Sequence, residues 1–284
     1  MTAAVGPLPD TLIEPLIRAA LAEDLGLAGD ITSIACIAED ARLAASFRSR
    51  RPGVLAGLAC ARLALAALDP SARFEALACD GDQVAGGQSL VRVEANARAL
   101  LSAERTALNF LGRLCGVATL ARAYVEAVAG TGAQITDTRK TTPTLRALEK
   151  YAVRCGGARN HRFGLDDAVL IKDNHVAAAG GVGPAIRRAR AAVGHLVKIE
   201  AEVDGLDQLD EALEAGPDVV MLDNFSLEDL RAAVARARDR VVLEASGSVT
   251  LETVRAIAET GVDVISVGAL THSAPVLDIG LDAE

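Results

Sequence analysis

The sequence predicts an α/β protein, in which an α+β first third precedes a barrel built from alternating strands and helices. Three observations carry this prediction. The chain of 284 residues is long enough for two domains, or for one large barrel with an extension. Its hydrophobic fraction of 51% supports a large core and excludes disorder. From residue 133 onward, short apolar runs alternate with helical stretches, which is the pattern of repeated βα units.

The first third combines helices with short strands. Residues 10–25 place apolar side chains at helical spacing, with Asp10 as the expected N-cap and Gly26 as the stop. A second helix is expected over residues 60–68. Alternation of apolar and polar residues predicts three strands, over residues 41–48, 72–78 and 89–95. Turn residues separate these segments, so this part is expected to fold as α+β.

A long helix is expected next, over about residues 99–129, with candidate breaks near Gly112 and Gly116. Apolar runs such as Leu63–Leu68 are far shorter than the roughly 20 residues that a membrane span needs. The N-terminus shows no secretory signal. The five cysteines are scattered, without a CxxC pair or a Cys/His cluster. We therefore expect a cytoplasmic protein with no membrane partner, no zinc site and no disulfide framework.

Six βα units follow. Their predicted strands cover residues 134–137, 168–172, 196–202, 218–223, 241–244 and 262–267. These runs are almost wholly apolar, as strands buried on both faces are, and they recur about every 20–35 residues, which is βα spacing. Such units suit a barrel or a doubly wound sheet. Polar residues follow nearly every run, which favours the barrel, because its carboxyl-end face carries the chemistry. A doubly wound sheet gathers its ligands at one switch point.

The charge of the chain excludes nucleic acid as a partner but points to another anion. The net charge is −9 and only 2% of residues are aromatic, whereas proteins that bind nucleic acid are usually basic or offer stacking platforms. Residues 135–175 nevertheless hold eight Arg or Lys against five acids. The whole chain has only four lysines, which are Lys140, Lys150, Lys172 and Lys198.

Cationic side chains end two of the predicted strands. Arg139, Lys140 and Lys172 would converge on the barrel mouth, where they repel one another unless an anion binds. A solvated basic face is the alternative. The positions favour a substrate with several carboxylates or phosphates. His161 and His272 could donate to such anions, or could be structural.

Carboxylates and small residues end the remaining strands. Glu202 and Asp223 suit a hard ion, and Mg²⁺ shared with a phosphorylated substrate is the natural candidate. A salt bridge with the barrel cations is the alternative. Ser246-Gly247-Ser248 and Gly268-Ala269 follow the last two strands, where β/α barrels often bind phosphate through backbone N–H groups.

The basic region closely resembles the quinolinate phosphoribosyltransferase family. The stretches that carry the resemblance most specifically are Asp137–Thr141, Lys150–Val153, Gly156–Arg162 and Leu170–His175. Further stretches extend it over nearly the whole chain: Ala22–Gly26, Ser102–Asn109, Leu222–Asn224 and Val267–His272. The resemblance implies transfer of the phosphoribosyl group of phosphoribosyl pyrophosphate to quinolinate with decarboxylation. The products are nicotinate mononucleotide, pyrophosphate and CO₂, in NAD biosynthesis.

The resemblance also implies an architecture. An N-terminal α/β sandwich domain would span residues 1–114, and an incomplete, open β/α barrel would span residues 115–269. The tail, residues 270–284, would pack back on the first domain. The family implies a homodimer, in which Arg105 would reach into the site of the partner subunit. Mg²⁺ would be the only cofactor, with no organic cofactor.

The resemblance assigns roles to individual residues. The groups expected to hold the two pyridine carboxylates are Thr138, Arg139, His161, Arg162 and Lys172. The groups expected to meet the ribose pyrophosphate and its Mg²⁺ are Lys140, Glu202 and Asp223. The groups expected around the 5′-phosphate are Ser246, Gly247, Ser248, Gly268 and His272. Of these, the catalytic residues would be Lys140, Lys172, Glu202 and Asp223, with Lys172 protonating or stabilising the carbanion left at C2.

The sequence departs from the family pattern at three positions where glycine is usual, namely Thr144, Ala158 and Ser248. If Ser248 must adopt a positive φ, its side chain costs about 1 kcal/mol. Three other functions stay open. They are a paralogous phosphoribosyltransferase associated with molybdenum transport, an aldolase-type lyase with a Schiff base on Lys172, and a metabolite-binding dimer without catalysis.

Overall fold

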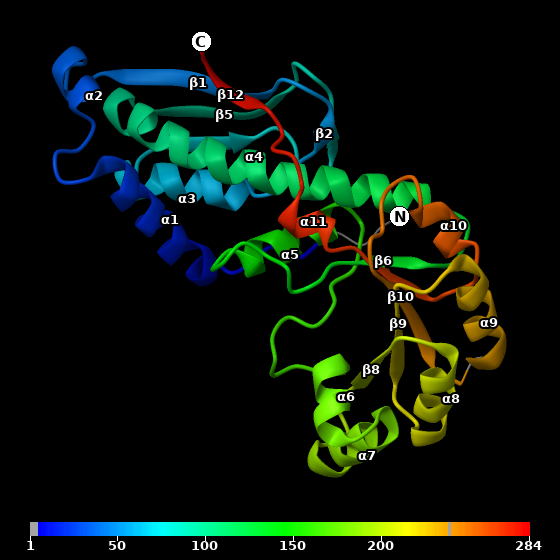
Figure 1. Ribbon diagram of the computed structural model, residues 1–284. Coiled ribbons are helices and arrows are strands. Elements are labelled where there is room, and N and C mark those ends of the chain that lie inside the picture. The colour runs from blue at the N-terminus through cyan, green and yellow to red at the C-terminus, as the bar shows by residue number, and fades with distance from the viewer. Residues whose placement is uncertain (1–4, 238–239) are drawn as a thin grey trace. The chain divides into compact units, whose positions relative to one another are not determined.

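A computed structural model describes residues 5–237 and 240–284 and divides the chain into two compact units (Figure 1). The first unit takes the chain up to Arg122, together with Thr142–Gly157 and Ser273–Glu284. The second unit takes Ala123–Thr141 and Ala158–His272. Each unit has its own sheet, as the change of pattern near residue 133 leads us to expect.

The first unit contains a four-stranded antiparallel sheet in the order β12-β1-β5-β3. Its strands are β1 (Arg42–Ser49), β3 (Arg73–Ala76), β5 (Ser89–Asn96) and β12 (Ile279–Ala283). A separate two-stranded ladder pairs β2 (Gly53–Val54) with β4 (Gln83–Val84). Helices of this unit lie along one face of the larger sheet (Figure 1), and apolar strand residues are fully buried there.

The helices of the first unit begin with α1 (Asp10–Leu25), which packs against α3 (Leu58–Leu68), and α2 (Ile31–Cys36) lies between them in sequence. The predicted helices and the three predicted strands are confirmed, with ends within about two residues. The N-cap of α1 is Pro9 rather than Asp10. Asp10 instead lies in the first turn and accepts a hydrogen bond of 2.7 Å from Arg62.

Helix α4 (Ala97–Ala127) is continuous, so the expected breaks at Gly112 and Gly116 are wrong. Both glycines have a packing role instead. A Cβ at Gly116 would collide with the backbone of Pro275, and one at Gly112 would meet Val276. The C-terminal segment therefore crosses α4 in close contact, and β12 then pairs with β1. Glycine inside a helix costs about 1 kcal/mol, which this close approach offsets.

Helix α5 (Arg146–Cys155) was not expected from the sequence and belongs to the first unit. Its Glu149 is fully buried and pairs with Arg113 of α4 at 2.7 Å. The predicted boundaries, 1–114 and 115–269, place this helix with the barrel. By its contacts, the segment Thr142–Gly157 groups with the first unit, and the bond from Arg113 to Glu149 is one of these contacts. The predicted domain boundaries themselves stay a prediction.

The second unit contains a six-stranded parallel sheet in the order β6-β11-β10-β9-β8-β7. Its strands are β6 (Gln134–Thr136), β7 (Val169–Ile171), β8 (Ile199–Val203), β9 (Val219–Asp223), β10 (Val242–Ser246) and β11 (Val264–Ser266). All six predicted strands are confirmed. Strands β6 and β7 form the two edges, so the sheet is an open barrel, as the resemblance implies.

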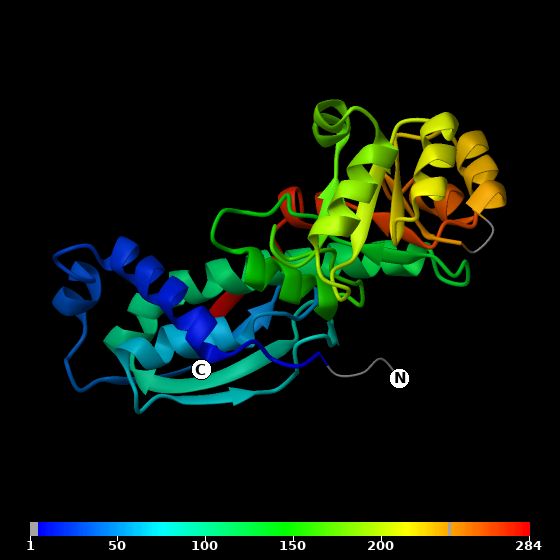
Figure 2. The same cartoon turned by 90° about the horizontal axis from the view of Figure 1, so that it is seen from below.

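Helices follow β7 to β11 in the βα pattern, and most of them lie on the outside of the open barrel (Figure 2). They are α6 (Asp173–Ala179), α7 (Val182–Ala192), α8 (Leu206–Ala215), α9 (Leu227–Ala237), α10 (Val254–Ala258) and α11 (Ala269–His272). Ile199, Val220 and Ile265 are completely buried in the sheet. Among the described residues, no helix is both long and apolar enough to cross a bilayer.

Candidate active site

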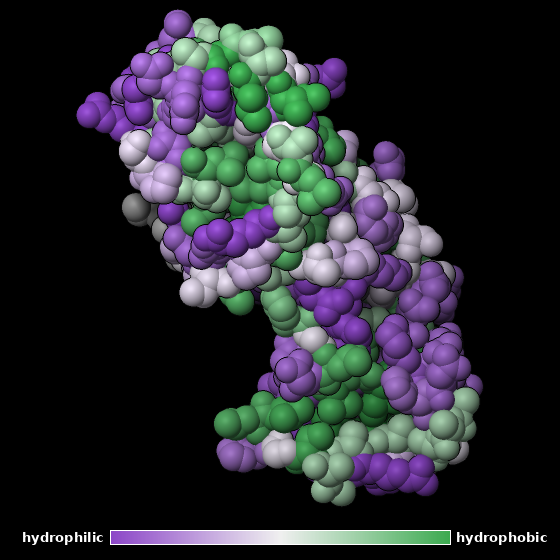
Figure 3. All heavy atoms as spheres, turned by 90° about the vertical axis from the view of Figure 1, so that its left-hand side faces the viewer, coloured by the Kyte–Doolittle hydropathy of each residue, from purple (hydrophilic) through white to green (hydrophobic). Residues whose placement is uncertain are grey.

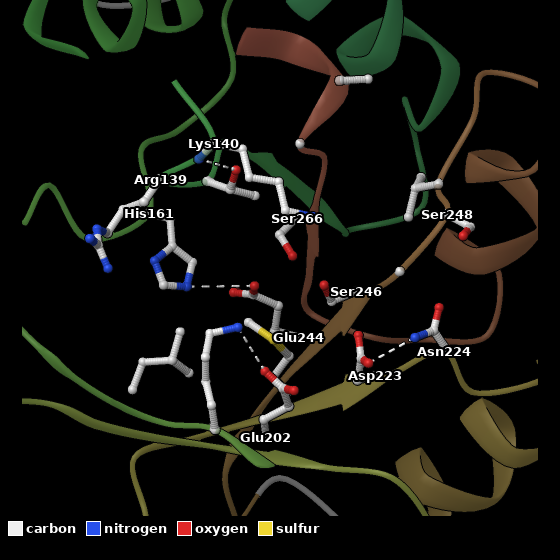
Figure 4. A pocket seen from close by; sticks show the side chains of 18 of the residues that line it. Arg139, Lys140, His161, Glu202, Asp223, Asn224, Glu244, Ser246, Ser248 and Ser266 are labelled. Atoms are coloured by element: carbon white, nitrogen blue, oxygen red, sulfur yellow. Dashed lines mark hydrogen bonds and ion pairs between the residues drawn. The ribbon is translucent and has the colours of Figure 1, made fainter. Parts of the chain in front are cut away.

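A cavity of about 830 Å³ lies at the carboxyl end of the open barrel (Figure 4). Parallel strands bring their carboxyl ends to one face, so residues far apart in sequence meet there. Apart from Arg105, every site residue predicted from the sequence lines this cavity. These are Thr138, Arg139, Lys140, His161, Arg162, Lys172, Glu202, Asp223, Ser246, Gly247, Ser248, Gly268 and His272.

Arg105 lies elsewhere, exposed on α4 of the first unit, and is not among the residues that line the cavity. Its expected role requires a second subunit, so the role stays a prediction.

Two arginines form a cationic wall of the cavity. The Nε atoms of Arg139 and Arg162 are buried and have no hydrogen-bond partner among the described residues. Arg162 also donates to the backbone oxygen of Ala168 at 3.0 Å. Burial and the charge of Arg139 lower the pKa of Arg162. Buried donors without partners are costly, so these two guanidinium groups favour an anionic ligand.

Lys172 ends β7 and faces a carboxylate across the cavity floor. Its Nζ lies 3.1 Å from Oε2 of Glu202, and its side chain is 50% exposed. A lysine that forms a Schiff base is usually desolvated or placed beside another cation. An exposed amine paired with a carboxylate has neither property. This geometry argues against the aldolase alternative.

Glu202 and Asp223 lie at the ends of neighbouring strands, and Asp204 joins them. One carboxylate oxygen from each lies within 4.8 Å of the others. Asp223 accepts a hydrogen bond of 2.7 Å from Nδ2 of Asn224. A set of carboxylates is the donor chemistry that Mg²⁺ prefers. The expected salt bridge is present as well, because Glu202 pairs with Lys172.

The loop after β10 has two consecutive residues with a positive φ, Gly247 and Ser248. Gly247 has φ 101°, and a Cβ there would collide with the side chain of Asn224. Ser248 has φ 49°, so the condition under which its side chain strains the backbone is met. Thr144, which also stands where the family usually has glycine, has φ 68°. Two of the three departures from the family pattern therefore fall on strained backbone, whereas the third, Ala158, is not among the described non-glycine residues with a positive φ.

The absence of a side chain at Gly268 leaves room for the side chains of Lys140 and His272 to lie close together. A Cβ at this position would lie 3.2 Å from the His272 ring and 3.2 Å from Cδ of Lys140. The backbone oxygen of Lys140 also accepts a hydrogen bond of 2.8 Å from Oγ1 of Thr271. Helix α11 thus fixes Lys140 and His272 on the same side of the cavity.

Two acids of this site were not predicted as site residues. Glu244 lines the cavity floor below His161 (Figure 4), and Glu200 lies beside it; they are 4% and 7% exposed. Oε2 of Glu200 lies 2.9 Å from Nε2 of His161, and Oε1 of Glu244 lies 3.6 Å from it. Burial and the charge of Glu200 raise the pKa of Glu244 to about 7.

A sequence signal for these acids exists. Glu200 precedes Glu202 by two residues, and Glu244 precedes Ser246 by two. Alternate residues of a strand share a face. An acid two positions before a strand-end site residue, in an otherwise apolar run, therefore points into the barrel.

Both parts of the chain match one protein family. Residues 30–115 match the family described as quinolinate phosphoribosyl transferase, N-terminal domain. Residues 117–282 match quinolinate phosphoribosyl transferase, C-terminal domain.

Individual relatives carry consistent names. A nicotinate-nucleotide pyrophosphorylase [carboxylating] of Mycobacterium leprae is 49% identical, covering 94% of this chain and 95% of the relative. A probable nicotinate-nucleotide pyrophosphorylase [carboxylating] of Bacillus subtilis is 42% identical, covering 95% of this chain and 93% of the relative. The solved structure of the nicotinate-nucleotide pyrophosphorylase from Francisella tularensis superposes with a TM-score of 0.93 at 39% identity, covering all of both chains.

Proposed function

The chain belongs to the quinolinate phosphoribosyltransferase family, and from that premise we propose how its cavity carries out the family's reaction. The enzyme transfers a phosphoribosyl group from phosphoribosyl pyrophosphate to quinolinate and releases CO₂, pyrophosphate and nicotinate mononucleotide, in NAD biosynthesis. The observation that carries the assignment of the site is the pair of arginines with buried, unpartnered Nε atoms, which line the same cavity as the two small-residue loops.

Quinolinate would bind on the cationic wall. It is a dianion, and burial of two carboxylates without counterions would cost many kcal/mol. Arg139, Arg162 and Lys172 supply three positive charges, and Thr138 completes the wall. Arginine–carboxylate pairs fix the orientation of a ring as well as its charge. Held in this way, N1 of the pyridine would be presented to C1′ of the ribose.

Phosphoribosyl pyrophosphate would lie across the other half of the cavity. Ser246, Gly247, Ser248, Gly268 and His272 would surround its 5′-phosphate. Glu202 and Asp223 would hold the Mg²⁺ that accompanies the pyrophosphate, with Asp204 within reach of the same ion. When bound, Mg²⁺ neutralises charge on the pyrophosphate. Lys140, held beside His272, would stabilise the same leaving group as the ribose becomes oxocarbenium-like.

Decarboxylation would follow the transfer. After N1 is ribosylated, the ring is a pyridinium, and it accepts the electron pair that remains when the C2 carboxylate leaves as CO₂. The substrate thereby acts as its own electron sink, so the proposed mechanism uses no organic cofactor. Lys172 would give C2 a proton or stabilise the carbanion. Its ion pair with Glu202 holds the side chain of Lys172 at the cavity.

We also propose a cytoplasmic homodimer in which Arg105 completes the site of the partner. Large apolar side chains are exposed on both units, including Leu27 and Ile31 on the first and Phe163 and Leu165 on the second. Figure 3 shows apolar patches bordered by polar surface, and bordered apolar patches are typical of interaction surfaces. All five cysteines are free thiols, as a reducing cytoplasm would keep them.

Complementation tests the shared site. Arg105→Ala and Lys172→Ala are each expected to be inactive alone. A mixture of the two would regain part of the activity, because one site of each heterodimer would have both native side chains. No recovery after confirmed subunit exchange would contradict the proposal.

Turnover tests the function itself. The protein is mixed with phosphoribosyl pyrophosphate, Mg²⁺ and either quinolinate or nicotinate, and both nicotinate mononucleotide and CO₂ are measured. We expect both products in equal amounts from quinolinate and no mononucleotide from nicotinate. No product from a folded dimer supplied with Mg²⁺ would favour the molybdenum-associated paralogue instead.

A further inference from the structure

The segment that carries Arg162 lies at the open edge of the barrel and has little regular structure. A single bridge connects Arg159 to Thr136 of β6, and residues 160–168 form no helix or strand. Backbone ladders therefore do not fix the position of Arg162. Side-chain hydrogen bonds must do so if the guanidinium is to be presented in one place.

A buried acid holds the start of this segment. Asp137 follows β6 and is completely buried. Its Oδ1 accepts from the backbone N–H of His161 at 2.8 Å, and its Oδ2 accepts from Nδ2 of Asn160 at 2.7 Å.

The His161 ring holds the next residue. Its Nδ1 accepts from the backbone N–H of Arg162 at 2.7 Å. This bond assigns the neutral tautomer with the proton on Nε2. Nε2 in turn donates to Oε2 of Glu200 at 2.9 Å, with Oε1 of Glu244 3.6 Å away. Both ring nitrogens are thus engaged by the protein, so a direct bond from His161 to a substrate carboxylate would first have to replace the bond to Glu200.

We propose that Glu200 and Glu244 are positioning residues for quinolinate binding, which hold the backbone of Arg162 through the His161 ring. The inference rests on the proposed function, in which Arg162 binds a substrate carboxylate. The acids come from β8 and β10, so the rigid interior of the sheet anchors the loop at its edge.

The composition of the cavity floor supports a positioning role. Buried acids beside an anion site oppose binding through their charge, and one oxygen each of Glu200 and Glu244 lacks a hydrogen-bond partner among the described residues. Replacement of such groups by apolar side chains is often neutral or stabilising. The presence of Glu200 is explained by the one bond that an apolar residue cannot make, in which its carboxylate accepts from Nε2 of His161. Glu244 lies beyond hydrogen-bond distance of the same nitrogen, so its effect on the ring is through its charge.

Steady-state kinetics of three variants test the proposal. Glu200→Ala removes the acceptor, and we expect KM for quinolinate to rise about tenfold, with kcat and KM for phosphoribosyl pyrophosphate changed less than threefold. Glu200→Gln keeps an oxygen acceptor and should stay within about threefold of the wild type. Glu244→Ala, which removes the more distant acid, should lie between them.

The matched control is Asp218→Asn, which alters a hydrogen-bonded carboxylate at the opposite end of the same sheet. It should lower the melting temperature without raising KM for quinolinate. Equal KM values for Glu200→Ala and the wild type would overturn the proposal while leaving the function intact. Equal increases for Glu200→Ala and Asp218→Asn would also overturn it, because general destabilisation would then explain both.

An NMR measurement tests the network without turnover. The chain has four histidines, so imidazole N–H signals are few. The Nε2 proton of His161 should give a slowly exchanging downfield signal in the wild type and in Asp218→Asn. It should be lost in Glu200→Ala and retained in Glu200→Gln. Retention in Glu200→Ala would overturn the proposal. Because this readout needs no substrate, it separates failure of the network from failure of the proposed function.

Discussion

The two ends of the parallel sheet shift the pKa values of their acids in opposite directions. At the amino end, Asp218 precedes β9; burial alone would raise its pKa, but hydrogen bonds from Lys198, Ile199 and Arg190 lower it to about 2. At the carboxyl end, burial and the charge of Glu200 raise the pKa of Glu244 to about 7. Asp218 lies just before β9, and Glu244 lies within the neighbouring strand β10 of the same sheet.

The difference separates stability from function within one unit. The amino-end acid has all its partners in the protein, so it contributes to stability. Among the described residues, the carboxyl-end acids and arginines keep buried atoms without protein partners, which costs stability. An anionic ligand would satisfy the arginine donors but not the acids. Perturbed pKa values of the second kind are typical of functional sites.

Substitution of one glycine at each end of the sheet should give the largest difference in activity between the two ends. Gly247 and Gly216 both have a positive φ, but only at Gly247 would a Cβ collide with a neighbour, the Asn224 side chain. We expect Gly247→Ala to lower kcat/KM for phosphoribosyl pyrophosphate about 100-fold, because the phosphate turn must shift. Gly216→Ala, which meets no atom within 4 Å, should cost about 1 kcal/mol of stability and leave kcat/KM unchanged. Similar kinetic losses in both variants would contradict the distinction.

The contributions of Glu244 and Asp218 to the free energy of unfolding should depend on pH in opposite directions. Glu244 has a folded-state pKa above the ordinary value of 4.5, so its contribution to stability is full below about pH 4.5 and is lost as the pH rises through 7. Glu244→Gln mimics the protonated acid. It should match the wild type near pH 5 and exceed its unfolding free energy at pH 8, by on the order of 2 kcal/mol. Denaturant titrations at pH 5 and pH 8 measure the difference in unfolding free energy between Glu244→Gln and the wild type. The same difference at both pH values would contradict a raised pKa of Glu244.

Asp218 should show the reverse dependence. Its folded-state pKa lies below the ordinary value of 3.8, so its contribution is present above about pH 4 and is lost as the pH falls towards 2. Asp218→Asn should cost about 1 kcal/mol at pH 7, a value discounted because Lys198 and Arg190 are partly exposed. The cost should shrink at pH 3. A cost that is independent of pH would show that the charge of Asp218 does not matter.

The smallest expected effects come from replacing the two strained residues, Ser248 and Thr144, by glycine. Ser248→Gly and Thr144→Gly should each stabilise the protein by up to about 1 kcal/mol, because glycine adopts a positive φ without strain. Only Ser248 lines the cavity, so only Ser248→Gly should change KM for phosphoribosyl pyrophosphate. Thermal unfolding and initial rates measure both effects. A changed KM in Thr144→Gly would show that strain release alone alters the site.

Much of the fold could be predicted because its signals are local. Apolar runs predict all six strands of the barrel, and helical spacing predicts α1. Helix α5 escaped prediction because it buries Glu149 and Lys150, which look exposed in the sequence. The partner of Glu149 is Arg113, and no local pattern shows this pairing. The helix breaks expected at Gly112 and Gly116 were wrong for a similar reason. These glycines accommodate a segment about 160 residues away in sequence, and no local pattern shows this contact.

The site was predictable wherever polar residues end strands. Strand-end positions and the family resemblance bring every predicted residue except Arg105 to one cavity. Glu200 and Glu244 were missed because they lie within the strands, one pleat below the ends. The hydrogen bond from Arg162 to His161 depends on loop geometry, which composition and spacing do not specify.

We conclude that residues at the carboxyl end of the parallel sheet carry out catalysis, whereas residues at its amino end stabilise the fold. Two lysines at opposite ends of the sheet allow a direct test. Lys172 ends β7 at the cavity, and Lys198 precedes β8 and pairs with Asp218. The measurement is kcat and KM for quinolinate in Lys172→Ala and Lys198→Ala. We predict a loss of about 100-fold in kcat for Lys172→Ala and a change below twofold for Lys198→Ala. Equal effects of the two changes, or an unchanged kcat in Lys172→Ala, would contradict the account.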